Sequence, residues 1–107
     1  MVRSVILKSM VRYQVKADRV EENQRLVEKV YEELHRSSPP GLHYATFKLE
    51  DGVSFVHIVS SESDEHNRAL TQLPAFQAFQ AGIKDRCDEP PAAVSWEEIG
   101  SYKFFGA

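Results

Sequence analysis

His57 is the residue whose type and setting point most directly to chemistry. It stands in an alternating run, and a tight turn at Asp51-Gly52 would set it opposite Thr46, with Tyr44 nearby and Arg12 on the matching face of an earlier strand. An imidazole titrates near neutral pH, so beside a phenol and a guanidinium it could act as a base or bind an anionic or phenolic ligand. The alternative is a structural histidine, satisfied by hydrogen bonds inside a subunit interface.

Tyr13 and Asn23 are further polar candidates because both fall within apolar patterns. Tyr13 belongs to the apolar face of the first strand, and Asn23 interrupts a helical stripe between Val20 and Val27. In a cavity the Asn23 amide could orient a ligand, whereas at a helix edge it would only contact water. We take His57 and Tyr13 as the candidate catalytic residues. The candidate ligand-binding residues are Asn23, Tyr31, Tyr44, Arg12, Phe76 and Phe79.

The aromatic members of that set have an alternative interpretation. Tyr31, Phe76 and Phe79 could line a cavity and stack on an aromatic ligand, or they could be plain core.

Metal and cofactor chemistry has no signature in the sequence. The other histidines, His35, His43 and His66, lack the spacing of metal ligands, and no HExxH run occurs. No glycine-rich loop follows a strand, which argues against a nucleotide cradle. Cys87 continues an apolar stripe with no base in view, as an inert buried thiol would. We therefore expect no metal and no cofactor.

The composition is that of an ordinary globular chain. Of 107 residues, 42% are hydrophobic and 27% charged, so we expect one domain over residues 1–107. The formal net charge is −3 with scattered basic residues, which argues against nucleic acid as a partner. Apolar runs are too short for a membrane span or a signal peptide. A single cysteine favours a reducing compartment, and we expect a cytoplasmic protein.

Patterns of period two and period 3.6 predict the elements that would position these residues. Residues 5–16 alternate as a half-buried strand, and Asp18 with Glu21 resembles a capping box that opens a helix. That helix ends at the Ser-Ser-Pro-Pro-Gly run of residues 37–41. Residues 42–50 and 53–60 then form a hairpin.

The Asp-Gly turn fixes the register of the hairpin, so that Lys48 faces Phe55, Thr46 faces His57 and Tyr44 faces Val59. Two faces follow. The more apolar face, the natural seat for helices, carries Ala45, Phe47, Leu49, Val56 and Ile58. The other face mixes aromatic and polar groups and carries Tyr44, Thr46, Lys48, Phe55, His57 and Val59.

A second helical region follows the hairpin. Residues 61–64 offer caps, and Pro74 restarts or bends the helix. One apolar stripe joins Phe76, Phe79, Ile83 and Cys87 at helical spacing. Pro90-Pro91 closes this helix, and residues 94–105 form the last strand.

This order predicts an α+β fold, a ferredoxin-like β-α-β-β-α-β sandwich with a four-stranded antiparallel sheet. Both helices would cover one face and leave Met10, Tyr44, Phe55 and Val59 on the other. A contiguous apolar patch of that kind predicts a homodimer whose sheets pack face to face. The alternative is a monomer with an open face that Arg12, Lys48 and His57 make partly polar.

Four segments carry a resemblance to a known family. They are the entry strand 10–16, the helix opening at Asp18, strand 55–60 running into Ser-Glu-Ser-Asp at 61–64, and Leu-Pro-Ala-Phe-Gln-Ala-Phe at 73–79. In these the chain resembles the antibiotic biosynthesis monooxygenase-like (ABM-like) proteins of the dimeric α/β-barrel superfamily. The resemblance implies a homodimer, with a cavity in each subunit between sheet and helices.

Members of this family differ in activity. Some oxidise aromatic polyketides with molecular oxygen, without metal or flavin, and others degrade haem with an Asn, a Trp and a His. Here the first-strand Asn position is Val11, the second helical stripe offers no His, and Trp96 belongs to the last strand, so the pattern points away from haem. The resemblance thus implies a cofactor-independent, monooxygenase-like protein acting on a small aromatic or quinone-type molecule. The alternative is a small-molecule-binding or structural homodimer without turnover.

Overall fold

The computed structural model describes residues 7–104, and its order of elements is the predicted one. The elements are β1 Leu7–Val15, the 3-10 turn η1 Ala17–Arg19, α1 Val20–Ser37, β2 Leu42–Lys48, β3 Ser54–Ser61, α2 Asp64–Thr71, α3 Pro74–Ala81, α4 Ile83–Arg86 and β4 Cys87–Ser95. Residues 5, 6 and 105, which the sequence assigned to strands, lie outside the described residues.

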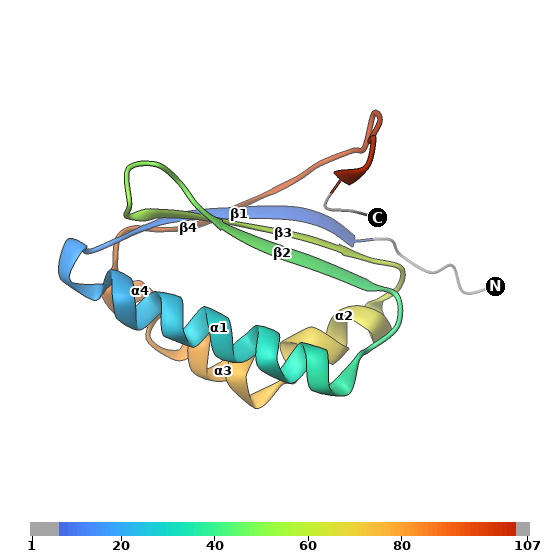
Figure 1. Ribbon diagram of the computed structural model, residues 1–107, viewed down its shortest axis with the longest axis horizontal. Helices are drawn as coiled ribbons and strands as arrows, with labels where there is room; N and C mark the ends of the chain where they lie inside the picture. The colour runs from blue at the N-terminus through green and yellow to red at the C-terminus, as the bar shows by residue number, and fades with distance from the viewer. Residues whose placement is uncertain (1–6, 105–107) are drawn as a thin grey trace.

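The strands form one antiparallel sheet in the order β2-β3-β1-β4, so β1 and β3 occupy its centre. All the helices lie on one side of this sheet (Figure 1). This arrangement confirms the predicted α+β, ferredoxin-like architecture. No described helix is long and apolar enough to cross a membrane.

The hairpin register is confirmed, since Lys48 pairs with Phe55 and Thr46 pairs with His57. The turn is longer than the predicted two residues. The Asp51 carboxylate accepts hydrogen bonds from the backbone N–H groups of Val53 and Ser54 at 3.0 and 2.8 Å. A side chain thus replaces ladder bonds in the turn without changing the register.

The predicted choice of faces in the hairpin is wrong. Phe55 and His57 are buried beneath the helices, whereas Ala45, Phe47, Val56 and Ile58 face away from them. The reason is the pairing with β1, in which Tyr13 lies opposite Phe55 and shares its face of the sheet. Because side chains alternate, the face that holds Tyr13 and Val15 also holds Phe55 and His57.

One helix start differs from the sequence prediction, and two agree with it. Asp18 lies in the 3-10 turn, and Arg19 caps α1 with no side-chain bond, so the predicted capping box is wrong. Ser63 caps α2 by accepting the backbone N–H of His66, within the predicted capping segment. Pro74 stands in the first turn of α3, where its missing N–H costs nothing.

The last strand comes earlier than the sequence predicted. Pro90 and Pro91 lie inside β4 instead of ending a helix, and Cys87 is the first residue of this strand. Proline is tolerated because β4 is an edge strand, and the pairing with β1 shifts register between Arg12 and Gln14. A register shift of this kind absorbs residues that cannot donate to the ladder.

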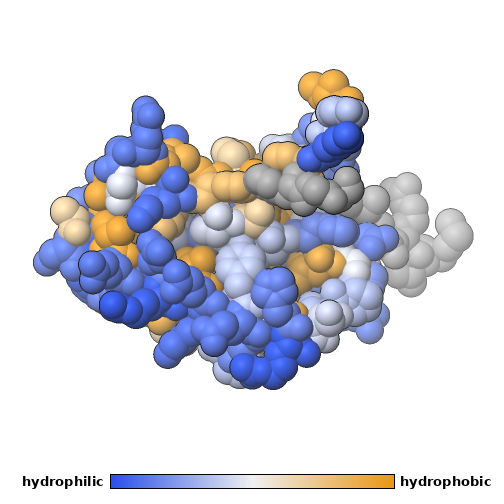
Figure 2. Space-filling model, in the orientation of Figure 1, coloured by the Kyte–Doolittle hydropathy of each residue, from blue (hydrophilic) through white to orange (hydrophobic). Residues whose placement is uncertain are grey.

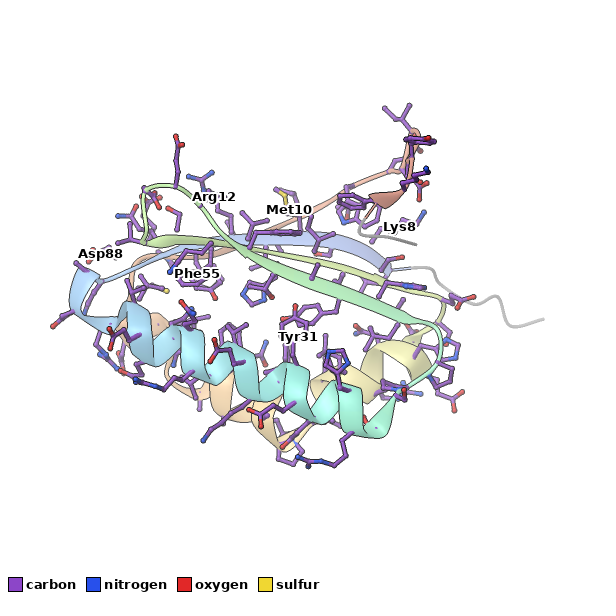
Figure 3. All side chains as sticks on the ribbon, viewed as in Figure 1. Lys8, Met10, Arg12, Tyr31, Phe55 and Asp88 are labelled. Carbon is purple, nitrogen blue, oxygen red and sulfur yellow. The ribbon has the colours of Figure 1, made fainter. Side chains whose placement is uncertain are left out.

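The uncovered side of the sheet joins the apolar face of the hairpin to polar side chains of β1 such as Lys8 and Arg12. Its central row crosses all four strands through Ala45, Ile58, Met10 and Val94. Figure 3 shows Met10 and Arg12 pointing away from the helices, while Phe55 and Tyr31 lie between the two layers. Tyr44, Phe55 and Val59, predicted for this open face, belong to the covered one.

The segment after β4 leaves the sheet on the side away from the helices (Figure 1). It exposes large apolar side chains, with Ile99 98% and Tyr102 83% accessible. Hydrophobic residues also gather along the upper part of the molecule, below this segment, while the outer surface of α1 is hydrophilic (Figure 2).

Candidate functional site

The candidate site is built around His57, which β3 holds between the sheet and the helices. Its side chain is 5% exposed, and both ring nitrogens are hydrogen-bonded. Nε2 lies 2.7 Å from the Tyr13 hydroxyl on β1, and Nδ1 lies 2.6 Å from the Tyr44 hydroxyl on β2. Three neighbouring strands therefore place one phenol at each nitrogen of the imidazole.

Hydrogen bonds extend this group in both directions. On one side Asn23 of α1 donates to the Tyr13 hydroxyl at 3.0 Å, and Arg86 of α4 donates through Nε to the Asn23 amide oxygen at 3.1 Å. On the other side Thr46 lies 3.2 Å from His57 Nδ1 and 2.7 Å from the Tyr31 hydroxyl. We call these seven residues the buried polar chain: Arg86, Asn23, Tyr13, His57, Tyr44, Thr46 and Tyr31.

Aromatic rings pack around the polar chain. Phe55 stacks on Tyr13 with ring centroids 5.6 Å apart, and Phe79 lies 5.2 Å from the His57 ring. Tyr31 stacks on Tyr44 at 5.4 Å, and Phe76 meets Tyr44 edge-on at 6.4 Å. These rings shield the centre of the chain, so the hydrogen bonds that join Tyr13 to His57 and to Asn23 lie in a medium of low dielectric constant.

Burial keeps the histidine and the three tyrosines of the chain uncharged at neutral pH. Desolvation lowers the pKa of His57 from 6.5 to about 4, because the imidazolium is poorly stabilised there. Burial raises the pKa of Tyr31 to about 12 and the pKa values of Tyr13 and Tyr44 beyond that. The site therefore presents neutral donors and acceptors.

Arg86 is the charged member of the chain, and it is 2% exposed. Desolvation lowers the pKa of its guanidinium, with the Glu22 carboxylate opposing that effect, but arginine stays protonated in proteins. Its Nη2 donates to the Phe79 carbonyl at 2.6 Å, and its guanidinium lies 5.4 Å from the Phe79 ring. In the described part of the chain no carboxylate lies within ion-pair distance of it.

The structure gathers most of the predicted site residues in one place. Tyr13, Asn23, Tyr31, Tyr44 and His57 join the polar chain, and Phe76 and Phe79 line it. The prediction that Arg12 lies beside His57 is wrong, because Arg12 pairs with Val56 on the open face. The predicted placement of His57 on the open, interface-forming face is also wrong.

Sequence reasoning missed Arg86. It stands 63 positions from Asn23, in a short polar stretch that the sequence gives no reason to bury. Only the end of α4 under the sheet brings it beside α1. Thr46 was placed opposite His57, but its bond to Tyr31 depends on how α1 packs, which the sequence does not give.

Surface hollows lie elsewhere in the described residues. One of about 530 Å³ is lined by Ala17, Asp18, Val20, Glu21, Lys48, Gly52 and Val53. Another of about 420 Å³ lies over residues 80–85. Neither touches the buried polar chain, so neither gives a ligand direct access to His57. Within residues 7–104 no group of three His, Cys, Asp or Glu side chains is arranged to hold a metal ion.

The fold and the site together define a ferredoxin-like α+β sandwich with a histidine held between two tyrosines. Many solved structures share this fold. A candidate antibiotic biosynthesis monooxygenase from Nitrosomonas europaea superposes with a TM-score of 0.72 at 17% identity, over 92% of this chain and 95% of that one. One from Bacteroides thetaiotaomicron superposes with a TM-score of 0.75 at 12% identity, over 88% of this chain and 90% of that one.

A third structure, a candidate antibiotic biosynthesis monooxygenase from Caulobacter crescentus, gives a TM-score of 0.72 at 10% identity, over 91% of this chain and 92% of that one. No family model matches the sequence. No curated protein matches it either. The chain therefore has the ABM-like fold, which the resemblance in its sequence implied.

Proposed function

We propose that this protein is a cofactor-independent, monooxygenase-like enzyme that acts on a small aromatic or quinone-type molecule. The observation that carries the proposal is the pair of hydrogen bonds that hold His57 between Tyr13 and Tyr44, inside an ABM-like fold. His57 and Tyr13 are the proposed catalytic residues. Asn23, Tyr31, Tyr44, Phe76 and Phe79 are the proposed ligand-binding residues, with aromatic rings to stack on an aromatic substrate.

The chemistry needs a substrate that can reduce oxygen itself. A CH₂ group between aromatic rings loses one proton to a base, and the resulting carbanion transfers electrons to O₂ and forms a carbon–oxygen bond. Loss of water, made from the second oxygen atom and the two hydrogens, leaves a carbonyl. The protein supplies orientation and proton transfer. The Tyr13 hydroxyl can take the substrate proton while it passes its own to His57 Nε2, 2.7 Å away.

Oxygen consumption with a panel of anthrones and hydroquinones tests this proposal. His57→Gln and Tyr13→Phe should each lower turnover by about 10²-fold or more, the usual size of general acid–base catalysis. Tyr102→Phe, on an exposed ring outside the site, is the matched control and should retain activity. Turnover that is unchanged in both site variants, in folded protein, would refute the assignment.

A non-enzymatic role is the second candidate, and two observations favour it. The members of the polar chain already bond to one another, and the hollows of the surface lie elsewhere. On this alternative the chain binds a small molecule or is a structural homodimer. The same substitutions would then change stability or ligand affinity, and no compound in the panel would be consumed.

We also propose that the protein is a homodimer whose open sheet faces pack together. A two-fold axis brings the same patch of each copy together, and the row through Ile58, Met10 and Val94 offers an apolar patch that no helix covers. Val94→Lys places a charge on a side chain that is 52% exposed and should yield monomers in light-scattering measurements. Glu32→Lys on the outer face of α1 is the control and should leave the mass unchanged. A monomeric wild type would contradict this proposal.

A further inference from the structure

We infer that Arg86 is a positioning residue: through Asn23 it fixes the direction of the hydrogen bond between Tyr13 and His57, and so holds His57 in its Nδ1–H tautomer. The inference deepens the proposed function and rests on it for its catalytic meaning. It is carried by four hydrogen bonds that follow one another without a break, from Arg86 to Tyr44.

The first step fixes the amide of Asn23. A guanidinium has donors and no acceptor, so the atom of Asn23 that meets Arg86 Nε must be the amide oxygen. The amide nitrogen then faces Tyr13. Arg86 is itself held in place, because its Nη2 donates to the Phe79 carbonyl and its plane lies near the Phe79 ring.

The second step fixes the hydroxyl of Tyr13. Its oxygen receives an N–H of Asn23, so its own hydrogen needs an acceptor. The acceptor within reach is His57 Nε2, at 2.7 Å. If Nε2 carried a proton, the Tyr13 hydrogen would be left in the core without this partner, in a side chain that is 2% exposed. A buried unsatisfied donor is unfavourable, so Nε2 is the bare nitrogen.

The third step follows from the neutral charge of His57. With Nε2 bare, the single proton of the ring resides on Nδ1, which faces the oxygens of Tyr44 and Thr46 at 2.6 and 3.2 Å. Thr46 is bonded in turn to Tyr31, which is only half-buried. The Tyr44 hydrogen can turn to Thr46 and the Thr46 hydrogen to Tyr31, so the last hydroxyl hydrogen lies at the edge of the core, where water can accept it.

The direction of the chain matters for the proposed chemistry. It leaves the basic nitrogen of His57 pointing at Tyr13 and makes the Tyr13 hydroxyl the donor, as proton transfer from Tyr13 to His57 requires. Arg86 contacts neither ring of this pair, so its part is to position them through Asn23.

Nitrogen-15 NMR of the histidine rings in the ligand-free protein tests the inference. The wild type should show His57 Nδ1 in the protonated range and Nε2 in the bare range. In Asn23→Asp the side chain can only accept, so the Tyr13 hydrogen should turn to the new carboxylate, and His57 should switch to the Nε2–H form. Arg86→Met removes the anchor and should give a mixture, with the two nitrogen resonances drawn together. Lys84→Met, on the exposed side of α4, is the control and should retain the wild-type pattern.

Three results would overturn the inference: an Nε2–H wild type, an unchanged tautomer in Asn23→Asp, or an unchanged tautomer in Arg86→Met. If Arg86→Met does not fold, Arg86→Lys replaces it. Lysine keeps the charge and the stem but cannot bond Asn23 and the Phe79 carbonyl in the same fork geometry, so the mixture is again expected. The NMR measurement needs no substrate, so the predicted tautomer can be found even if the protein consumes no oxygen. A failure of this inference is therefore distinguishable from a failure of the proposed function.

Discussion

Replacing His57 by glutamine should flatten the dependence of stability on pH in the acid range. Burial lowers the His57 pKa from 6.5 to about 4, so between these values the unfolded chain binds a proton that the folded chain does not. Stability therefore rises with pH across this window. The contribution of His57 is fully present above 6.5 and is lost as the pH falls through the folded pKa of about 4.

The size of the effect follows from the two pKa values. Each pKa unit between the folded and unfolded states is worth about 1.4 kcal/mol. A change from 6.5 to about 4 thus makes the wild type less stable by about 3 kcal/mol below the window than above it. About 2 kcal/mol of this appears between pH 7 and pH 5, which is a sizeable part of the roughly 5–15 kcal/mol by which a domain is typically stable.

Urea unfolding of the two proteins at pH 7 and pH 5 measures this difference. Glutamine has a similar size and both a donor and an acceptor, but it does not titrate, so His57→Gln should lose about 2 kcal/mol less than the wild type between these pH values. His43→Gln, which removes an exposed histidine from β2, should keep the wild-type pH dependence. Parallel curves for wild type and His57→Gln would show that the buried imidazole is not held neutral, and the reasoning would fail.

Three further predictions concern single side chains. Tyr13→Phe leaves His57 and Asn23 without a shared partner in the core and should lower the free energy of unfolding in urea by about 1–3 kcal/mol, with an unchanged far-ultraviolet circular dichroism spectrum. A methyl group on Gly41, at φ +70°, would lie 2.5 Å from a neighbouring imidazole, so Gly41→Ala should cost more than Gly52→Ala, whose φ is +79° with open space around it. Burial raises the pKa of the Cys87 thiol, so it should react with Ellman's reagent far more slowly in the folded than in the unfolded protein, and equal rates would show that it is accessible.

Local pattern was enough to predict most of the elements. The hairpin register could be predicted because an Asp-Gly turn leaves few ways to pair two alternating strands, and Thr46 does lie opposite His57. The restart of a helix at Pro74 could be predicted because proline is suited to a first turn. In each case the information lies within a few residues along the chain.

The last strand could not be predicted in this way. Pro90 and Pro91 normally end regular structure, yet here they lie in β4. Proline is acceptable there only because β4 is the edge of the sheet and its pairing with β1 shifts register, and both are facts of tertiary structure. Arg86 was missed for the same reason, since only the tertiary fold brings its side chain to Asn23 of α1.

The choice of faces shows how the site and the assembly are related. Hydrophobicity alone assigned the inner face to Phe47, Val56 and Ile58, but the helices cover His57 and the tyrosines instead. The covered face tolerates the buried polar chain because the members of the chain satisfy one another, which removes most of the cost of burying them. In the hairpin the more apolar face, with Phe47, Val56 and Ile58, is left without a cover from its own chain. In the proposed dimer a second copy would supply such a cover, which places the interface at Met10, Ile58 and Val94 and separates it from the buried polar chain. Substitutions at the interface should therefore change the oligomeric state without altering the tautomer of His57, and a tautomer that changed on dissociation would show that the two faces are coupled.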